Sequence, residues 1–219
     1  MSSNQEAKPV VLLHGLNRTS RSLEKLGRVL DDKGFEVHNI SYPSTRFPIE
    51  KLAKDLRQGE LAPLADRDDL CFVTHSMGGI ILRWIESYMP MPGLFRSVML
   101  APPNQGSEVA DAMMNLRLAR WLNGPALEQL GTMSNSLPLE LEDINFHCGV
   151  LAGSRSSNPF FRRFFDEAND GKVAVESTKD PGVADWRVLD VFHSTMMKNR
   201  AVIDHTLHFL EHGWFEKVH

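Results

Sequence analysis

The chain has few cysteines, and they do not form the pattern of a disulfide framework or of a metal site. Its 219 residues include two cysteines, Cys71 and Cys148, which are too few for a disulfide framework. Both fall in apolar runs that predict buried strands, where a free cysteine behaves as a small apolar residue. The histidines and cysteines also lack the spacing of a closed metal site. We therefore expect a cytoplasmic protein with no metal and no other cofactor.

An excess of basic charge is also missing. The 24 Lys and Arg residues are outnumbered by 28 Asp and Glu residues, which gives a net charge of −4. The densest basic pair is Arg162-Arg163, and no longer basic stripe follows it. A mildly acidic chain without a basic stripe is a poor ligand for a polyanion. We therefore expect no nucleic-acid partner.

Long hydrophobic runs are absent as well. No segment approaches the roughly 18 consecutive apolar residues of a membrane-spanning helix. Residues 1–8 are polar and carry no apolar signal core. The sequence therefore predicts neither a transmembrane segment nor a secretory leader.

Short apolar runs alternate with amphipathic segments along the chain. The runs predict strands at residues 9–14, 35–41, 70–74, 95–101, 146–153 and 186–191. Helical spacing of apolar residues predicts helices at 20–33, 49–64, 80–88 and 195–212. This alternation indicates an α/β fold with a mostly parallel sheet of about six strands and helices on both faces. The length favours a single domain over residues 1–219.

Residues 104–144 interrupt this alternation and are rich in Met and Leu. We interpret them as a mostly helical insertion. Its side chains have two readings: they line an apolar acyl pocket, or they pack on the core. The members concerned are Met113, Met114, Leu116, Trp121 and Met133. The Phe160–Phe165 cluster has the same two readings, and exposure of either patch would favour peripheral contact with lipid or with a partner.

The segment with the clearest chemistry is VTHSMGG at residues 73–79, between a predicted buried strand and a predicted helix. This is the context of a sharp turn that lifts a nucleophilic serine, here Ser76, above the sheet edge. Gly78 supplies the small residue that such a turn needs after the serine. Thr74 stands where the usual pattern has glycine, which weakens the match. The alternative is that Ser76 only caps the helix that follows it.

A serine nucleophile needs two backbone N–H groups to hold the oxyanion, one from the residue after the serine and one from the loop after the first strand. Met77 and Leu16 occupy these positions. Gly15 lies in the same loop. His14 and His75 stand at strand ends, where a ring more often braces a loop than takes part in catalysis. We therefore expect these two histidines to support the loops of the site, together with Gly15 and Gly78.

With a serine turn of this kind, an acid and then a histidine follow the serine along the chain. His193 lies between the last predicted strand and the last helix, at the sheet edge where the serine is expected. The acids between the fifth strand and His193 are Asp166, Glu167, Asp170, Asp180, Asp185 and Asp190. Asp170 is favoured because its NDG turn leads into an apolar segment. The alternative for Asp170 is that its side chain serves only its own turn.

These segments together resemble the α/β-hydrolase superfamily, and most closely its small single-domain lipases and esterases. The resemblance rests on VVLLHGLNRTSRS at 10–22, VTHSMGGIILRW at 73–84, APPNQGSEVAD at 101–111, NDGKVAVEST at 169–178 and FHSTMM at 192–197. It implies a triad of Ser76, Asp170 and His193, and an oxyanion hole made by the N–H groups of Leu16 and Met77. It also implies that residues 102–107 line the cleft and that the insertion forms a cap or lid.

The resemblance implies a serine hydrolase that cleaves carboxylic esters through an acyl-enzyme, acting on a small-molecule or lipid ester. One alternative is cleavage of another acyl bond, a thioester or an amide, since one fold hosts many reactions. Another is a catalytically silent scaffold that acts as a binding protein. The sequence specifies neither the oligomeric state nor the length of the acyl chain.

Overall fold

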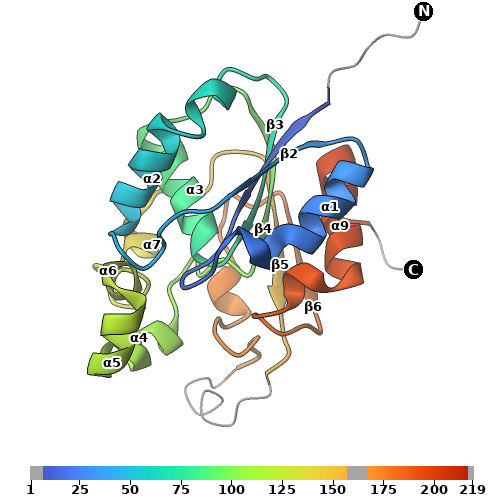
Figure 1. Ribbon diagram of the computed structural model, residues 1–219. Coiled ribbons are helices and arrows are strands. Elements are labelled where there is room, and N and C mark those ends of the chain that lie inside the picture. Colours follow the sequence, from blue (N-terminus) through green and yellow to red (C-terminus); the bar gives the residue numbers. More distant parts are fainter. Residues whose placement is uncertain (1–6, 157–166, 217–219) are drawn as a thin grey trace, which may run out of the picture.

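A computed structural model describes residues 7–156 and 167–216 (Figure 1). Three features of the sequence lie outside these residues: the Arg162-Arg163 pair, the Phe160–Phe165 cluster and the candidate acid Asp166.

The centre of the fold is a six-stranded sheet in the order β2-β1-β3-β4-β5-β6, and every neighbouring pair is parallel. The strands are β1 (Pro9–Leu13), β2 (Glu36–Ile40), β3 (Leu70–His75), β4 (Leu94–Leu100), β5 (Cys148–Gly153) and β6 (Asp185–Leu189). The predicted α/β class and the six strands are confirmed. β6 ends before the predicted limit of residue 191.

Two pairs of helices cover the two faces of this sheet (Figure 1). On one face lie α1 (Glu24–Asp32) and α9 (Arg200–His212), and on the other lie α2 (Ile49–Gln58) and α3 (Met77–Tyr88). Successive side chains of a strand point to opposite faces. In β1, Val11 and Leu13 therefore join the core under α2 and α3, while Val10 and Leu12 join the core under α1 and α9. Apolar burial on both faces explains why the strands read as continuous apolar runs.

Several predicted helices begin or end in tighter turns. The segment before α1 is the 3₁₀ turn η1 (Ser20–Leu23), and the one before α9 is η4 (Met196–Lys198). The helix predicted to reach residue 64 ends at Gln58, because Gly59 follows it, and a separate turn η2 (Ala62–Leu64) comes after. The helix predicted from residue 80 begins at Met77, so the serine turn abuts it directly.

The insertion consists of short helices in the green and yellow part of Figure 1. They are α4 (Glu108–Met114), α5 (Arg117–Asn123), α6 (Pro125–Glu128) and α7 (Leu137–Glu140). Leu127 and Leu130 are buried in the core. Trp121 is 78% exposed, and Leu116 and Met133 are also exposed. The prediction that these three side chains either line an acyl pocket or pack on the core is therefore wrong. No helix in residues 7–156 and 167–216 is long and apolar enough to cross a membrane.

A buried ion pair ties the insertion to the core. Arg83 on α3 lies 3.4 Å from Asp180, and both side chains are almost fully buried. The guanidinium also donates hydrogen bonds to the carbonyl oxygens of Asn104, Leu141 and Glu142, at both ends of the insertion. The Asp180 carboxylate accepts hydrogen bonds from the N–H groups of Ile144 and Gly182. Arg83 therefore holds together segments far apart in the sequence.

We expect Arg83→Met to lower the free energy of unfolding by about 3–5 kcal/mol at pH 7, because it leaves the Asp180 carboxylate buried without a counter-charge. In an Asp180→Asn background the same change should lower the free energy of unfolding by less, since no buried charge is then left without a partner. Chemical denaturation of the single and double variants measures both. Arg120→Met is the control, because its ion pair with Glu128 is exposed and worth less than about 1 kcal/mol. Equal costs for Arg83→Met in the two backgrounds would contradict this account.

Candidate active site

Ser76 lies in a strained turn between β3 and α3. Its backbone has φ 54° and ψ −124°, in the left-handed half of conformational space that non-glycine residues seldom adopt. Its N–H donates a hydrogen bond to the Leu100 carbonyl at the end of β4. Ser76 occupies the position before the first residue of α3, but within the described part of the chain its side chain makes no capping hydrogen bond. The capping role that the sequence left open therefore does not account for this serine.

The turn brings two loops into close contact. A Cβ atom on Gly15 would lie 3.0 Å from the Ser76 Cβ. A Cβ on Gly78 would lie 2.5 Å from the Leu13 carbonyl oxygen, closer than a carbon and an oxygen can approach. Glycine at these two positions allows the end of β1 and the start of α3 to meet.

Thr74 fits its position because Gly79 stands opposite it. Thr74 is fully buried in β3, and its hydroxyl oxygen has no hydrogen-bond partner among the residues that the structure describes. A Cβ on Gly79 would lie 3.3 Å from that oxygen. The same Cβ would lie 3.1 Å from Pro102 and 3.2 Å from Met99, so glycine at this position relieves crowding by Thr74 and by both of these side chains.

His193 and Asp170 form a buried pair. The His193 Nδ1 and the Asp170 Oδ2 are 2.7 Å apart, and the two side chains are 4% and 1% exposed. An ionised carboxylate only accepts hydrogen bonds, so Nδ1 carries the proton and Nε2 is left to accept one. The His193 N–H also donates to the Asp170 carbonyl, which fixes the two backbones relative to each other.

The second oxygen of Asp170 holds the turn that follows it. Oδ1 accepts hydrogen bonds from the N–H groups of Lys172 at 3.0 Å and Val173 at 2.9 Å. The sequence posed two alternatives for Asp170, an acid facing His193 or a residue serving its own turn. The structure shows both at once, because Oδ2 contacts the His193 ring and Oδ1 accepts the hydrogen bonds of the turn.

Four of the other candidate acids lie away from the His193 ring or face solvent. Asp180 pairs with Arg83, and Asp185 accepts a hydrogen bond from the Phe215 N–H. Asp190 is exposed, as is Glu167. Among the acids that the structure describes, Asp170 alone contacts the His193 ring.

His75 lies beside His193 and supports its backbone. The His75 Nε2 is 3.0 Å from the His193 carbonyl oxygen, to which it donates, and the two rings are 4.7 Å apart between centroids. Burial lowers the pKa of His75 well below its usual value, and the neighbouring His193 lowers it further. His75 therefore stays neutral and acts as a hydrogen-bond donor.

His14 braces the loop after β1. Its ring stacks on Tyr42, with centroids 4.0 Å apart and an interplanar angle of 8°. Nδ1 contacts the Gly15 carbonyl at 2.9 Å, and Nε2 accepts a hydrogen bond from the Tyr42 N–H at 3.2 Å. The Tyr42 hydroxyl donates to the His14 carbonyl. These contacts hold the segment that carries Gly15 and Leu16.

The N–H groups of Leu16 and Met77 have no hydrogen-bond partner within the part of the chain that the structure describes. Met77 is the first residue of α3, where N–H groups point away from the helix and its dipole favours negative charge. Both positions are therefore suited to hold an oxyanion near Ser76.

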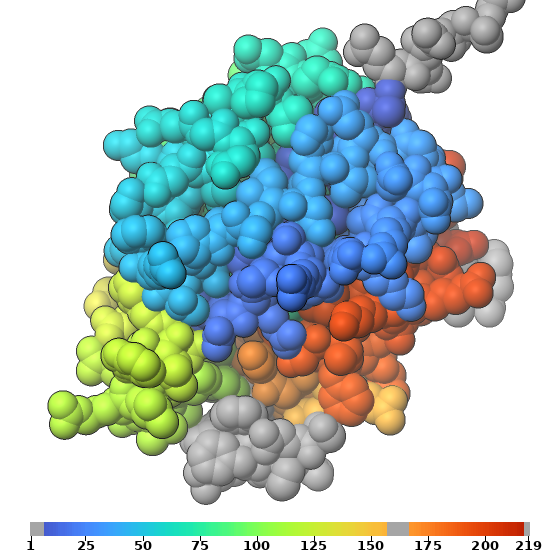
Figure 2. Space-filling view, viewed as in Figure 1, coloured from blue at the N-terminus to red at the C-terminus, as the bar shows by residue number. Residues whose placement is uncertain are grey.

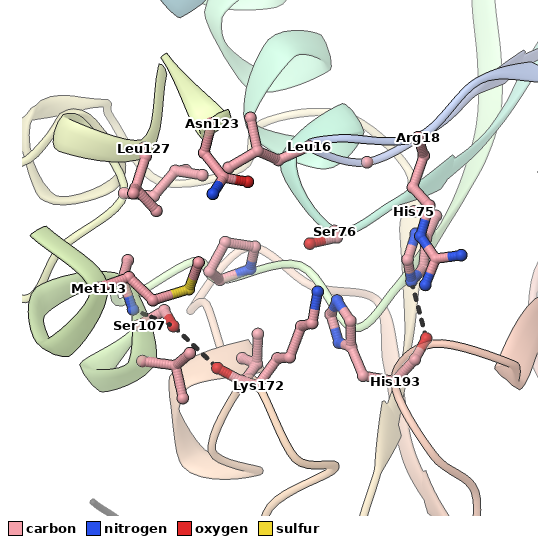
Figure 3. Close-up of a pocket in the computed structure, with 16 residues that line it drawn as sticks. Leu16, Arg18, His75, Ser76, Ser107, Met113, Asn123, Leu127, Lys172 and His193 are labelled. Atoms are coloured by element: carbon pink, nitrogen blue, oxygen red, sulfur yellow. Dashed lines mark hydrogen bonds between the residues drawn. The ribbon is translucent and has the colours of Figure 1, made fainter. Parts of the chain in front are cut away.

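Ser76 and His193 line one pocket (Figure 3). No hydrogen bond joins the Ser76 hydroxyl to the His193 ring among the described residues. In free enzymes a catalytic hydrogen bond is often long and tightens only when substrate binds. Met113, Leu127 and Leu130 of the insertion line the same pocket, as do Pro103 and Ser107 from the loop after β4.

The sequence did not point to the two basic residues of this pocket, Arg18 and Lys172. Figure 3 draws the Lys172 side chain extending toward Ser76 and His193, and Arg18 beside them. Neither belongs to a motif, and their only mark in the sequence is that each lies two residues beyond a predicted site residue: Arg18 after Leu16, and Lys172 after Asp170. The described residues contain no cluster of His, Cys, Asp or Glu able to hold a metal ion.

A family model and several solved structures match this chain. Residues 10–213 match the model of a family described as the alpha/beta hydrolase family. A search of curated proteins finds no match. Among solved structures, a lipase from Bacillus licheniformis in its mature form superposes with a TM-score of 0.72 at 18% identity, over 94% of this chain and 93% of that one. The structure of the same lipase with its propeptide is longer, and this chain covers 51% of it.

Two further structures are similar. A metagenomic carboxyl esterase gives a TM-score of 0.71 at 21% identity, over 87% of this chain and 65% of that one. A phospholipase from Legionella pneumophila gives a TM-score of 0.66 at 18% identity, over 93% of this chain and 57% of the phospholipase. At these identities the likeness establishes the fold.

The low pKa of His75 predicts a loss of stability in acid. Below pH 6.5 the unfolded chain takes up a proton at His75 that the folded chain does not, so stability falls as pH falls. In His75→Gln the slope of unfolding free energy against pH, between pH 6 and 5, should be shallower by up to about 1.4 kcal/mol per pH unit. Denaturation at several pH values measures it. His38→Gln, at a partly exposed ring, is the control. A slope unchanged from wild type would refute the prediction.

Proposed function

The chain belongs to the alpha/beta hydrolase family, and from that premise we propose that it is a serine hydrolase that cleaves carboxylic esters. Ser76 is the nucleophile, His193 the base, and Asp170 the acid that orients the base. Leu16 and Met77 supply the N–H groups of the oxyanion hole.

One observation carries the proposal: a serine with positive φ shares a pocket with a histidine whose far nitrogen is bound by a buried carboxylate. Backbone strain at a solvent-reachable serine is typical of functional sites. A buried carboxylate behind a histidine selects the tautomer that accepts a proton. The likeness to a lipase and a carboxyl esterase gives further support.

In the first half of the reaction, the Ser76 Oγ attacks the ester carbonyl carbon while the His193 Nε2 takes the hydroxyl proton. The carbonyl oxygen becomes an oxyanion, which accepts hydrogen bonds from the Leu16 and Met77 N–H groups. Each such donor is worth about 3–4 kcal/mol of transition-state stabilisation in related reactions. The Asp170 carboxylate stabilises the imidazolium that forms.

In the second half, His193 gives its proton to the leaving alcohol oxygen as the carbon–oxygen bond breaks, which leaves an acyl group on Ser76. Water then attacks this acyl-enzyme, with His193 again taking a proton. The acid is released and the Ser76 hydroxyl is restored. The apolar side chains of Met113, Leu127 and Leu130 provide one wall along which an acyl chain would lie.

We expect Ser76→Ala to abolish hydrolysis of p-nitrophenyl esters, from acetate to palmitate, and labelling by a fluorophosphonate probe. The change removes only the attacking oxygen, so circular dichroism should match wild type. Ser87→Ala is the control, because Ser87 is exposed on the same helix. The dependence of the wild-type rate on chain length separates an esterase from a lipase.

The alternatives give different results in the same assay. Probe labelling without turnover of any ester would indicate another acyl bond, such as a thioester or an amide. Absence of both would indicate a silent scaffold. Full activity in Ser76→Ala would refute the assignment of the nucleophile.

Asp170→Asn should lower kcat by roughly 10³–10⁴-fold. The Oδ1 position is held by two backbone N–H groups, so the new amide NH₂ would take the place of Oδ2 and face His193. His193 would then carry its proton on Nε2 and be unable to accept one from Ser76. Steady-state kinetics measure the change, and Asp190→Asn, three residues before His193, is the matched control. A damaging Asp190→Asn together with an active Asp170→Asn would overturn the choice of acid.

A further inference from the structure

Two cationic side chains line the candidate active site. Lys172 and Arg18 line the same pocket as Ser76 and His193, although they come from segments over 150 positions apart in the sequence. The Lys172 side chain extends toward the space between Ser76 and the His193 ring, and Arg18 lies on the His193 side (Figure 3).

The Lys172 backbone is fixed on both sides. Its N–H donates to the Asp170 Oδ1 at 3.0 Å, and its carbonyl accepts a hydrogen bond from the Ser107 hydroxyl at 2.8 Å. Ser107 in turn accepts a hydrogen bond from the Ala110 N–H and so caps α4. The base of Lys172 is therefore anchored to the acid of the proposed triad and to the insertion.

Neither cation has an acidic partner among the described residues. No ion pair or side-chain hydrogen bond there involves the Lys172 ammonium or the Arg18 guanidinium, and both residues are half-buried. Burial lowers the pKa of Lys172, the nearby Arg18 charge lowers it further, and Asp170 opposes both effects. Two like charges kept partly out of water repel each other, and a bound anion would relieve that cost.

The opposite side of the pocket is apolar. Met113 and Leu127 lie across Ser76 from Arg18 in Figure 3, and Leu130 also lines the pocket. The pocket is therefore divided, with the proposed nucleophile between an apolar side and a cationic side.

We propose that the substrates are esters of an apolar acid with an alcohol that carries a carboxylate or a phosphate, and that Lys172 and Arg18 bind this anion. The proposal rests on the proposed ester hydrolysis and specifies its substrate class. Carboxylate and phosphate share the chemistry that Lys and Arg recognise, a compact anion with several acceptor oxygens.

The orientation follows from the role proposed for His193. To protonate the leaving oxygen, His193 must lie on the alcohol side of the ester. Arg18 lies on that same side, whereas the insertion lies on the other. The anion is therefore assigned to the alcohol part and the apolar chain to the acyl part.

The test uses two matched pairs of substrates that differ in charge. For the carboxylate, 4-butanoyloxybenzoate is compared with 4-butanoyloxybenzamide. For the phosphate, 1-butanoylglycerol 3-phosphate is compared with 1-butanoylglycerol. The readout is the ratio of kcat/KM for the charged member to kcat/KM for the neutral one. We expect a ratio of about ten or more in wild type for at least one pair, and the pair with the larger ratio identifies the anion.

Lys172→Met and Arg18→Gln should each lower that ratio by about tenfold, and the double variant should bring it to about one or below. Lys54→Met is the matched control, because it removes one positive charge from an exposed position on α2 and should leave the ratio unchanged. The wild-type ratio should also fall between 50 mM and 500 mM salt, because added ions screen the attraction.

A second measurement separates this proposal from the proposed reaction. Isothermal titration of the Ser76→Ala protein with 4-butanoyloxybenzoate and its carboxamide needs no turnover. We expect tighter binding of the carboxylate, lost on adding Lys172→Met. Ser76-dependent turnover with ratios near one, unchanged by Lys172→Met, would overturn the anion site and leave ester hydrolysis standing. Absence of turnover and of probe labelling would overturn ester hydrolysis, and the titration would still decide the anion site.

Discussion

The site depends on how one carboxylate shares its two oxygens. Asp170 gives Oδ2 to His193 and Oδ1 to the backbone N–H groups of Lys172 and Val173. The same group therefore sets the orientation of the imidazole and the course of the turn that carries Lys172 into the pocket. A change at Asp170 acts on both, which ties the proposed chemistry to the proposed recognition of charge. Ser107 extends the connection to α4 through the Lys172 carbonyl.

A second constraint is the space between the end of β1 and the start of α3. In a parallel sheet the carboxyl ends of the strands meet at one edge, and ligands bind where the strand order reverses, here between β1 and β3. The contact at that point is so close that Gly78 leaves no room for a Cβ and Gly15 leaves little. The closeness of the two loops brings the residues proposed for the oxyanion hole, Leu16 and Met77, near Ser76.

Much of this could be predicted from the sequence, for a physical reason. Apolar runs of strand length and helical spacing fix the parallel sheet, and the turn at Ser76 has a local signature in VTHSMGG. Chain order then favours His193 as the base, but it leaves several acids, and the NDG turn is what favours Asp170 among them. The insertion was harder, because short helices bury few residues and leave side chains such as Trp121 exposed. Arg18 and Lys172 carry no motif at all: their roles depend on two distant loops meeting, which only the folded chain reveals.

Costly features gather at this one edge of the sheet. Ser76 has a strained backbone, and among the described residues the buried Thr74 hydroxyl has no hydrogen-bond partner and neither Arg18 nor Lys172 has an ion-pair partner. Away from this edge, both faces of the sheet are packed with apolar side chains. A folded chain carries such local conflicts only where the surrounding packing compensates for them, and natural sequences retain them chiefly at functional sites. The presence of these three features around Ser76 is therefore an argument for function at this pocket that does not depend on any similarity to other proteins.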